Sequence, residues 1–143
     1  MPLLNYTTSI PAFRTISEMQ HKLAKAGASQ VMHGYDSFGR VTQIAFRIHT
    51  KFGDISYLLP ANIEAVEAVL KKQFPRRKPD LGQAERVGWR ILKDWLEAQL
   101  ALIETGMVTI EQVFLPYAQN AQGQTLYEAL LEKKFTGLAL PVE

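Results

Sequence analysis

The segment between residues 81 and 104 constrains the fold of this 143-residue chain most strongly. Asp80 and Gln83 have the spacing of a helix N-cap, and no proline follows before Gly106. Apolar side chains recur there at roughly helical intervals, at Val87, Ile91, Trp95 and Leu102. The sequence therefore predicts one helix about 35 Å long, at 1.5 Å rise per residue.

The N-terminal half changes from helical to alternating periodicity. Thr15 and Glu18 have capping-box spacing, which predicts a helix over residues 16–26 that Gly27 ends. Alternation of apolar residues over 29–35, 44–49 and 55–59, with turn-rich tetrapeptides between, predicts a three-stranded antiparallel meander. Asn62 is placed to cap a second helix that runs to about residue 73.

Short helices are expected after the long one. Thr109 and Thr125 each begin a further capping box, predicting helices near 110–115 and 126–134. The apolar tail, residues 135–141, should pack on the domain or on a partner. We thus predict an α+β fold in one domain, residues 1–143. The proline-containing loop 74–80 separates an N-terminal αβββα part from a C-terminal helical part.

Composition excludes several kinds of site. The chain has no cysteine, which removes disulfides, thiolate zinc sites and cysteine nucleophiles. The three histidines lack metal-ligand spacing, and the isolated glycines form no phosphate-binding motif. We expect no metal, no cofactor and no catalytic centre, although a metal-dependent carboxylate enzyme stays as a third alternative.

The N-terminus does not resemble a signal peptide, and every apolar stretch is far shorter than the roughly 20 residues of a membrane span. We therefore expect a cytoplasmic protein without membrane contact. The oligomeric state is open, and a homo-oligomer is one alternative.

Basic residues concentrate after the second predicted helix, although the net charge is only +2. Five of the eight residues from 71 to 78 are cationic: Lys71, Lys72, Arg76, Arg77 and Lys78. Long exposed cations can reach phosphates without burial, so a nucleic-acid backbone contact is one hypothesis. The alternative is a solvated linker whose lysines favour a helix C-terminus.

The long helix and the sheet offer two further basic surfaces. Arg86, Arg90 and Lys93 share one helix face, which predicts a phosphate contact or, through Asp94 and Glu97 four residues on, ordinary ion pairs. One sheet face and its turns could bind single-stranded bases, or could be the polar side of a half-covered sheet. Its residues are Arg47, Lys51 and Phe52, together with His49 and Arg40.

Trp89 and Trp95 lie six residues apart and therefore on nearly opposite sides of the long helix. Either could anchor a protein interface, or both could be covered by neighbouring elements.

Four stretches of the chain resemble small proteins of bacterial prophages and other mobile genetic elements, to which no activity is assigned. They are residues 86–104, 112–117, 5–8 and 50–60. The resemblance implies a setting in which small accessory proteins handle DNA or block a host machine, and it brings no catalytic residues.

The sequence therefore favours a non-catalytic accessory protein of a phage or mobile element that binds single-stranded DNA by its phosphate backbone. The alternative is a protein-interaction module that binds and inhibits a host or phage enzyme through the long helix, a tryptophan and the apolar tail.

Overall fold

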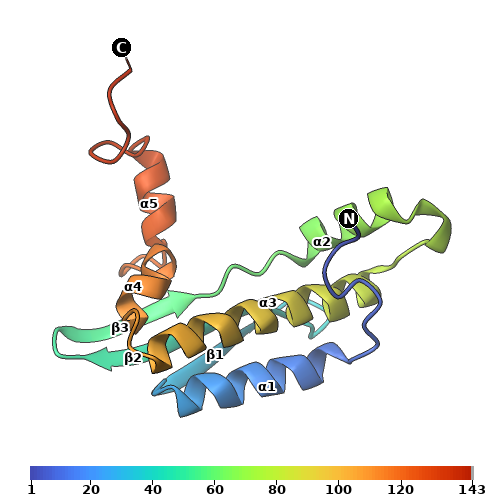
Figure 1. Ribbon diagram of the computed structural model, residues 1–143, viewed down its shortest axis with the longest axis horizontal. Coiled ribbons are helices and arrows are strands. Elements are labelled where there is room, and N and C mark those ends of the chain that lie inside the picture. The colour runs from blue at the N-terminus through green and yellow to red at the C-terminus, as the bar shows by residue number, and fades with distance from the viewer. Residues whose placement is uncertain (143) are drawn as a thin grey trace.

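A three-stranded antiparallel sheet lies behind two long helices in the computed structural model, which describes residues 1–142 (Figure 1). The strands β1 (Gln30–Tyr35), β2 (Val41–Thr50) and β3 (Gly53–Leu58) pair in chain order. Phe46 lies opposite Val31 on one side and Tyr57 on the other, so alternate residues form one apolar face. The predicted meander and the α+β class are confirmed.

Helices α1 (Ala12–Lys25) and α3 (Leu81–Glu104) cover that apolar face side by side (Figure 1). Helices α1 and α3 run parallel to each other. Their ion pairs show this, since Glu18 contacts Arg90 and the later residue Lys22 contacts the later residue Glu97. The core between the layers is mainly apolar and contains Met19, Leu23, Ile44, Phe46, Tyr57, Trp89, Leu96 and Phe114.

The start of α1 differs from the prediction. The helix begins at Ala12, and its N-cap is Pro11, which makes no side-chain capping bond. Thr15 lies inside the helix with a fully buried side chain, so the capping box expected at Thr15 and Glu18 is wrong. The same residue spacing also occurs within helices, where it has no capping role, and Pro11, with a non-helical ψ of 143°, lies just before the first helical residue.

Helix α2 (Ile63–Gln73) runs antiparallel to α3 and packs on it away from the sheet, around Leu70, Ala84 and Val87. The side chains of Asn62 and Asp80 cap α2 and α3 as predicted, accepting hydrogen bonds from the backbone N–H of Ala65 and of Gln83. The connecting loop contains one 3₁₀ turn, η1 (Pro75–Arg77). The two helices and this loop form the α2–α3 hairpin.

The C-terminal part leaves the two-layer body. Helix α4 (Ile110–Phe114) continues as the 3₁₀ turn η2 (Leu115–Tyr117), and Gln119 donates its backbone N–H to Ser56 on β3. Helix α5 (Leu126–Glu132) then projects away from the body (Figure 1). Both predicted capping boxes, at Thr109 and Thr125, are present.

Candidate nucleic-acid interface

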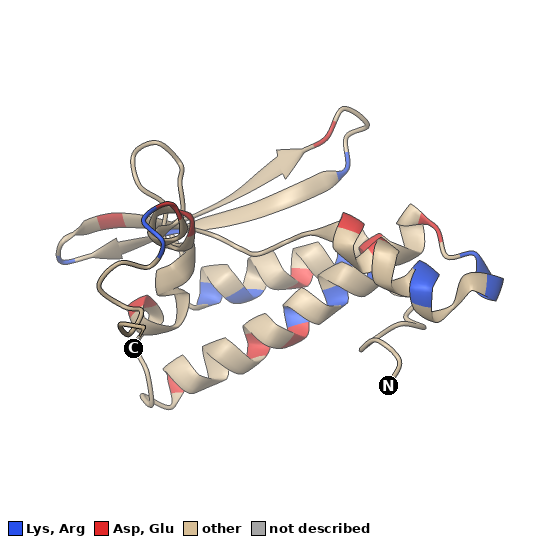
Figure 2. Ribbon diagram, turned by 90° about the horizontal axis from the view of Figure 1, so that it is seen from above, with Lys and Arg blue, Asp and Glu red and all other residues tan. Residues whose placement is uncertain are grey.

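Five cationic residues gather at the end of the α2–α3 hairpin, at one end of the molecule (Figure 2). All five side chains are exposed, and Lys71 pairs with Glu67 at 3.6 Å, within its own helix. We call this surface the basic tip; its members are Lys71, Lys72, Arg76, Arg77 and Lys78. The structure thus brings together the whole of the predicted basic cluster.

An aromatic stack supports the basic tip. The rings of Tyr6 and Phe74 lie 4.7 Å apart and nearly parallel, and the Arg77 guanidinium lies 5.0 Å from the Phe74 centroid and 5.7 Å from that of Tyr6. Gln83 holds the N-terminal segment there by donating Nε2–H to the Tyr6 carbonyl at 2.9 Å. These contacts orient Arg77, because a cation is attracted to an aromatic face.

Arg86 is the one member of the predicted helix face that adjoins the basic tip. Its Nε and Nη2 both donate to Gln83 Oε1, at 3.0 and 2.7 Å. A cleft of about 410 Å³ lies between Arg86 and the aromatic stack, and Lys78 and Asp80 also line it. Arg86 therefore extends the cationic surface from the loop onto α3.

Arg90 and Lys93 serve a different purpose. Arg90 is buried, and its Nη1 donates to Glu18 Oε2 at 2.9 Å, while Lys93 lies 2.7 Å from Glu97. The hydrogen bond from Arg90 holds the pKa of the Glu18 carboxyl below its ordinary value, and that from Lys93 does the same for the pKa of Glu97. These two cations join α1 to α3 and do not form an open basic face with Arg86.

The predicted sheet residues lie far from the basic tip. Lys51 and Phe52 form the β2–β3 turn, at the opposite end of the molecule from the α2–α3 loop (Figures 1 and 2). Lys51 Nζ lies 5.1 Å from the centroid of the exposed Phe52 ring, and Arg47 donates from Nε to Ser56 on the neighbouring strand. His49 contacts Asp54 across the same hairpin. The basic tip and the predicted sheet residues therefore do not form one continuous binding surface.

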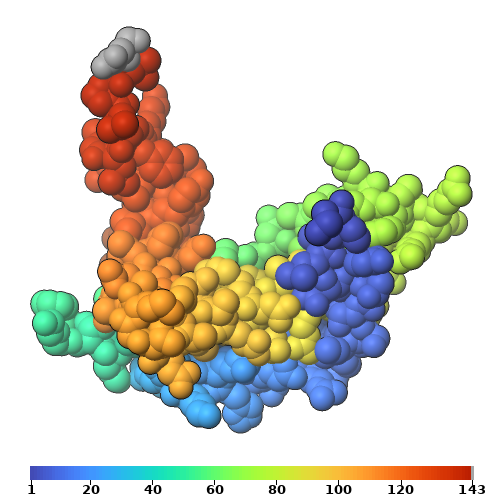
Figure 3. Space-filling view, viewed as in Figure 1, coloured from blue at the N-terminus to red at the C-terminus, as the bar shows by residue number. Residues whose placement is uncertain are grey.

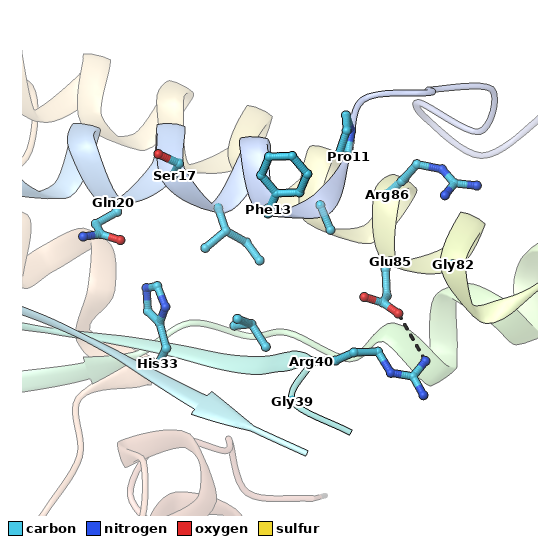
Figure 4. A pocket seen from close by; sticks show the side chains of 13 residues that line it. Pro11, Phe13, Ser17, Gln20, His33, Gly39, Arg40, Gly82, Glu85 and Arg86 are labelled. Carbon is cyan, nitrogen blue, oxygen red and sulfur yellow. Dashed lines mark hydrogen bonds and ion pairs between the residues drawn. The ribbon is translucent and has the colours of Figure 1, made fainter. Parts of the chain in front are cut away.

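A second cleft, of about 490 Å³, opens between the start of α1, the β1–β2 turn and the first turn of α3 (Figure 4). The Phe13 ring, 76% exposed, stands at its rim, and an ion pair of 3.3 Å between Arg40 and Glu85 lies across it. His33 Nε2 is buried and has no hydrogen-bond partner within residues 1–142. Arg86 lines this cleft as well as the one at the basic tip.

This cleft combines an apolar rim with hydrogen-bonding groups, which are Ser17, Gln20 and His33 (Figure 4). That combination suits a flat heterocycle, whose faces are apolar and whose edges hydrogen-bond. The sequence offered little signal for it: Phe13, Ser17 and Gln20 look like surface positions of an amphipathic helix. Tyr6 was missed for a related reason, because its partner Phe74 is distant in the sequence.

Comparisons with protein families and with known proteins identified no relative of this chain. No family model, curated protein or solved structure matches this chain. Within residues 1–142, no three His, Asp or Glu side chains are grouped to hold a metal ion. In the same part of the chain, no helix has the length and apolar character to cross a membrane. The candidate interface therefore rests on the geometry of the basic tip.

Proposed function

We propose that this protein binds single-stranded DNA without catalysis, through phosphate contacts of the basic tip and Arg86. The observation that supports this most is the exposure of all five cations of the basic tip at one end of the molecule. Exposed cations keep most of their hydration until a phosphate displaces it, and binding then releases counterions from the strand. The setting in a phage or mobile element remains part of the proposal.

The two clefts favour a single strand over a duplex. Arg86 lies between them, so a strand whose phosphates contact the basic tip can reach Phe13 and the second cleft along the start of α3. An unpaired base can stack on an exposed ring such as Phe13, whereas the bases of a duplex are already stacked on one another. Phe13 replaces the distant Phe52 as the stacking residue of the proposal.

The alternative of an inhibitory protein-interaction module loses its tryptophan anchor. Trp89 is fully buried, and Trp95 is partly buried, with its ring edge-on to Phe114 and Tyr117 at 5.9 and 5.7 Å. Neither indole is presented as a free surface. The long helix is likewise occupied, because α1, α2 and the sheet pack around it.

The proposal is tested by fluorescence anisotropy of a labelled single-stranded oligonucleotide, measured at several salt concentrations with the wild type and with K72A/R76A. These two exposed cations have no ion pair in residues 1–142, so their removal should leave the fold intact. Loss of two phosphate contacts should weaken binding at least tenfold and reduce the dependence of log K on log salt by about 0.7 per contact.

The matched control is K25A/K51A, which removes the same charge from exposed positions outside the basic tip. It should bind within about twofold of the wild type at 0.15 M salt, where charges beyond roughly 8 Å are screened. Equal weakening by both double variants would mean that only net charge matters, and the basic tip would then not be a site. Absence of binding by the wild type at low salt would refute the function itself.

A further inference from the structure

The cleft of about 410 Å³ at the basic tip, which we call the tip cleft, is lined by three cations and one carboxylate. The cations are Arg77 and Lys78 of the α2–α3 loop and Arg86 of α3, and the carboxylate is that of Asp80. The N-terminal segment forms another wall through Tyr6; Figure 3 shows this segment, in dark blue, against the α2–α3 hairpin. Separate parts of the chain therefore meet around one cationic cleft.

The three cations of the tip cleft have no counter-charge. Within residues 1–142, none of them forms an ion pair, whereas the other two cations of α3 are both paired. Arg86 is partly buried, and two of its nitrogens donate to the neutral amide oxygen of Gln83. A buried cation usually has an anion beside it, because its charge has lost hydration. The free charge of Arg86 therefore suits a negatively charged ligand.

Two of these cations are held in place without being neutralised. The Arg77 guanidinium lies over the uncharged rings of Tyr6 and Phe74. Lys78 has φ 47° and ψ 56°, a left-handed conformation that is unfavourable for a residue with a Cβ atom. Strained conformations of this kind cluster at sites that bind ligands. Cations that are already positioned lose less conformational freedom when a ligand binds.

The charge of the tip cleft indicates which kind of anion it suits. The Asp80 carboxylate caps α3, where its Oδ1 accepts from the Gln83 backbone N–H at 2.8 Å. Three positive charges against this one negative charge leave a net charge of +2. A terminal phosphate carries about −1.5 to −2 at pH 7 and has three acceptor oxygens. A phosphodiester within a strand carries a single negative charge, so it matches the cleft less well.

We infer that the tip cleft binds the phosphomonoester at the end of a DNA strand, so that this protein prefers phosphorylated strand ends. The inference rests on the proposed function and adds the place on the strand at which binding occurs. The cleft volume lies within the roughly 300 to 1,000 Å³ of small-ligand sites, which leaves room for one terminal nucleotide. Lys72 and Arg76 do not line the cleft and remain available for phosphates farther along the strand.

The experiment is fluorescence anisotropy with three internally labelled oligonucleotides of one sequence, which end in a 5′-phosphate, in a 3′-phosphate or in hydroxyls alone. We expect a phosphate at one of the two ends to tighten binding about tenfold, the effect of one added charged hydrogen bond. The variants R86Q and K78Q should each remove most of this difference. Lys78 is exposed, so K78Q tests the cleft even if R86Q disturbs α3, and circular dichroism verifies the fold of both.

The matched control is R76Q, at an exposed position of the basic tip that does not line the cleft. It should weaken binding of all three oligonucleotides by a similar factor and keep the difference between them. Equal binding of the three by the wild type would overturn the inference and leave the proposed function standing, whereas no binding of any would refute both. A difference lost in R76Q as fully as in R86Q would also overturn the inference, because the phosphate would then respond to the whole basic tip.

A free mononucleotide presents the same phosphomonoester, so competition with thymidine monophosphates distinguishes the two sources. We expect them to displace the phosphorylated strand only far above its dissociation constant, because they lack the contacts with Lys72 and Arg76. Displacement at concentrations close to that constant would assign the tip cleft to small nucleotides and overturn its assignment to a strand end.

Discussion

Gly88 shows how a single residue sets the distance between two helices. A Cβ atom at this position would lie 2.7 Å from Ile63 Cδ1 and 3.3 Å from Val66 Cγ2, both on α2. Glycine lowers the intrinsic stability of a helix by about 1 kcal/mol relative to alanine. At Gly88 that loss is offset by the close packing of α2, which in turn holds the basic tip in place.

Replacing Gly88 with valine should lower the free energy of unfolding by about 2 kcal/mol, because a branched side chain cannot fit without displacing α2. Urea denaturation followed by circular dichroism measures the change. The control is A98V, at an exposed position of the same helix, which should cost less than about 1 kcal/mol, from β-branching alone. Equal losses in the two variants would show that helix propensity, and not the contact with α2, explains Gly88.

At the scale of elements, a small ion-pair network stabilises the contact between helices α1 and α3. Glu18 of α1 accepts from the buried Arg90, and Glu97 of α3 lies 3.1 Å from Lys22 and 2.7 Å from Lys93. A buried guanidinium without its partner is costly, since its charge has lost its hydration. The network therefore fixes the direction and register of the two helices on the sheet.

The variant E18Q should lower the free energy of unfolding at pH 7 by about 2 kcal/mol, because Arg90 then lacks its counter-charge. The hydrogen bond from Arg90 holds the pKa of the Glu18 carboxyl below its ordinary value in the folded protein. Its stabilisation is therefore present above the unfolded pKa and is lost as the pH falls through the folded value.

Denaturation profiles should consequently converge as the pH drops below about 4.5, with the wild type losing more stability than E18Q. The control is E104Q, at an exposed glutamate at the end of α3, which should follow the wild type at each pH. A constant difference between wild type and E18Q across the acid range would contradict the charge-based explanation.

At the scale of the molecule, the main feature is the separation of three surfaces. The basic tip lies at one end, the β2–β3 turn at the other, and α5 projects from the body beside that turn (Figures 1 and 2). Under the proposed function, a strand bound at the basic tip would therefore approach Phe13 and not Phe52.

Substitution of the exposed Phe13 and Phe52 can test which surface binds a single strand, the one near the basic tip or the one at the β2–β3 turn. We predict that F13A weakens binding of a single-stranded oligonucleotide by about 1 to 3 kcal/mol, the usual loss of one base–aromatic stack, while F52A has no effect. Anisotropy titrations at one salt concentration measure both variants. Weaker binding by F52A and normal binding by F13A would place the strand on the sheet instead.

Interactions that are local in the chain could be read from the sequence. Asn62, Asp80, Thr109 and Thr125 cap their helices through a bond to a residue three positions on, and the strands alternate because their side chains point to opposite faces. The basic tip belongs to this class, since its five cations are within one short segment. The sequence alone thus determined the meander, the helices apart from the start of α1, and the grouping of the five cations.

Only the tertiary structure decided what depends on contacts between distant residues. Arg90 and Lys93 look like part of a basic face until α1 brings Glu18 against them, and Tyr6 joins Phe74 across nearly half of the chain. The separation of Phe52 from the basic tip and the exposure of α5 likewise depend on tertiary structure. Such pairings have no period in the sequence, because they arise from how elements pack and not from how each one forms.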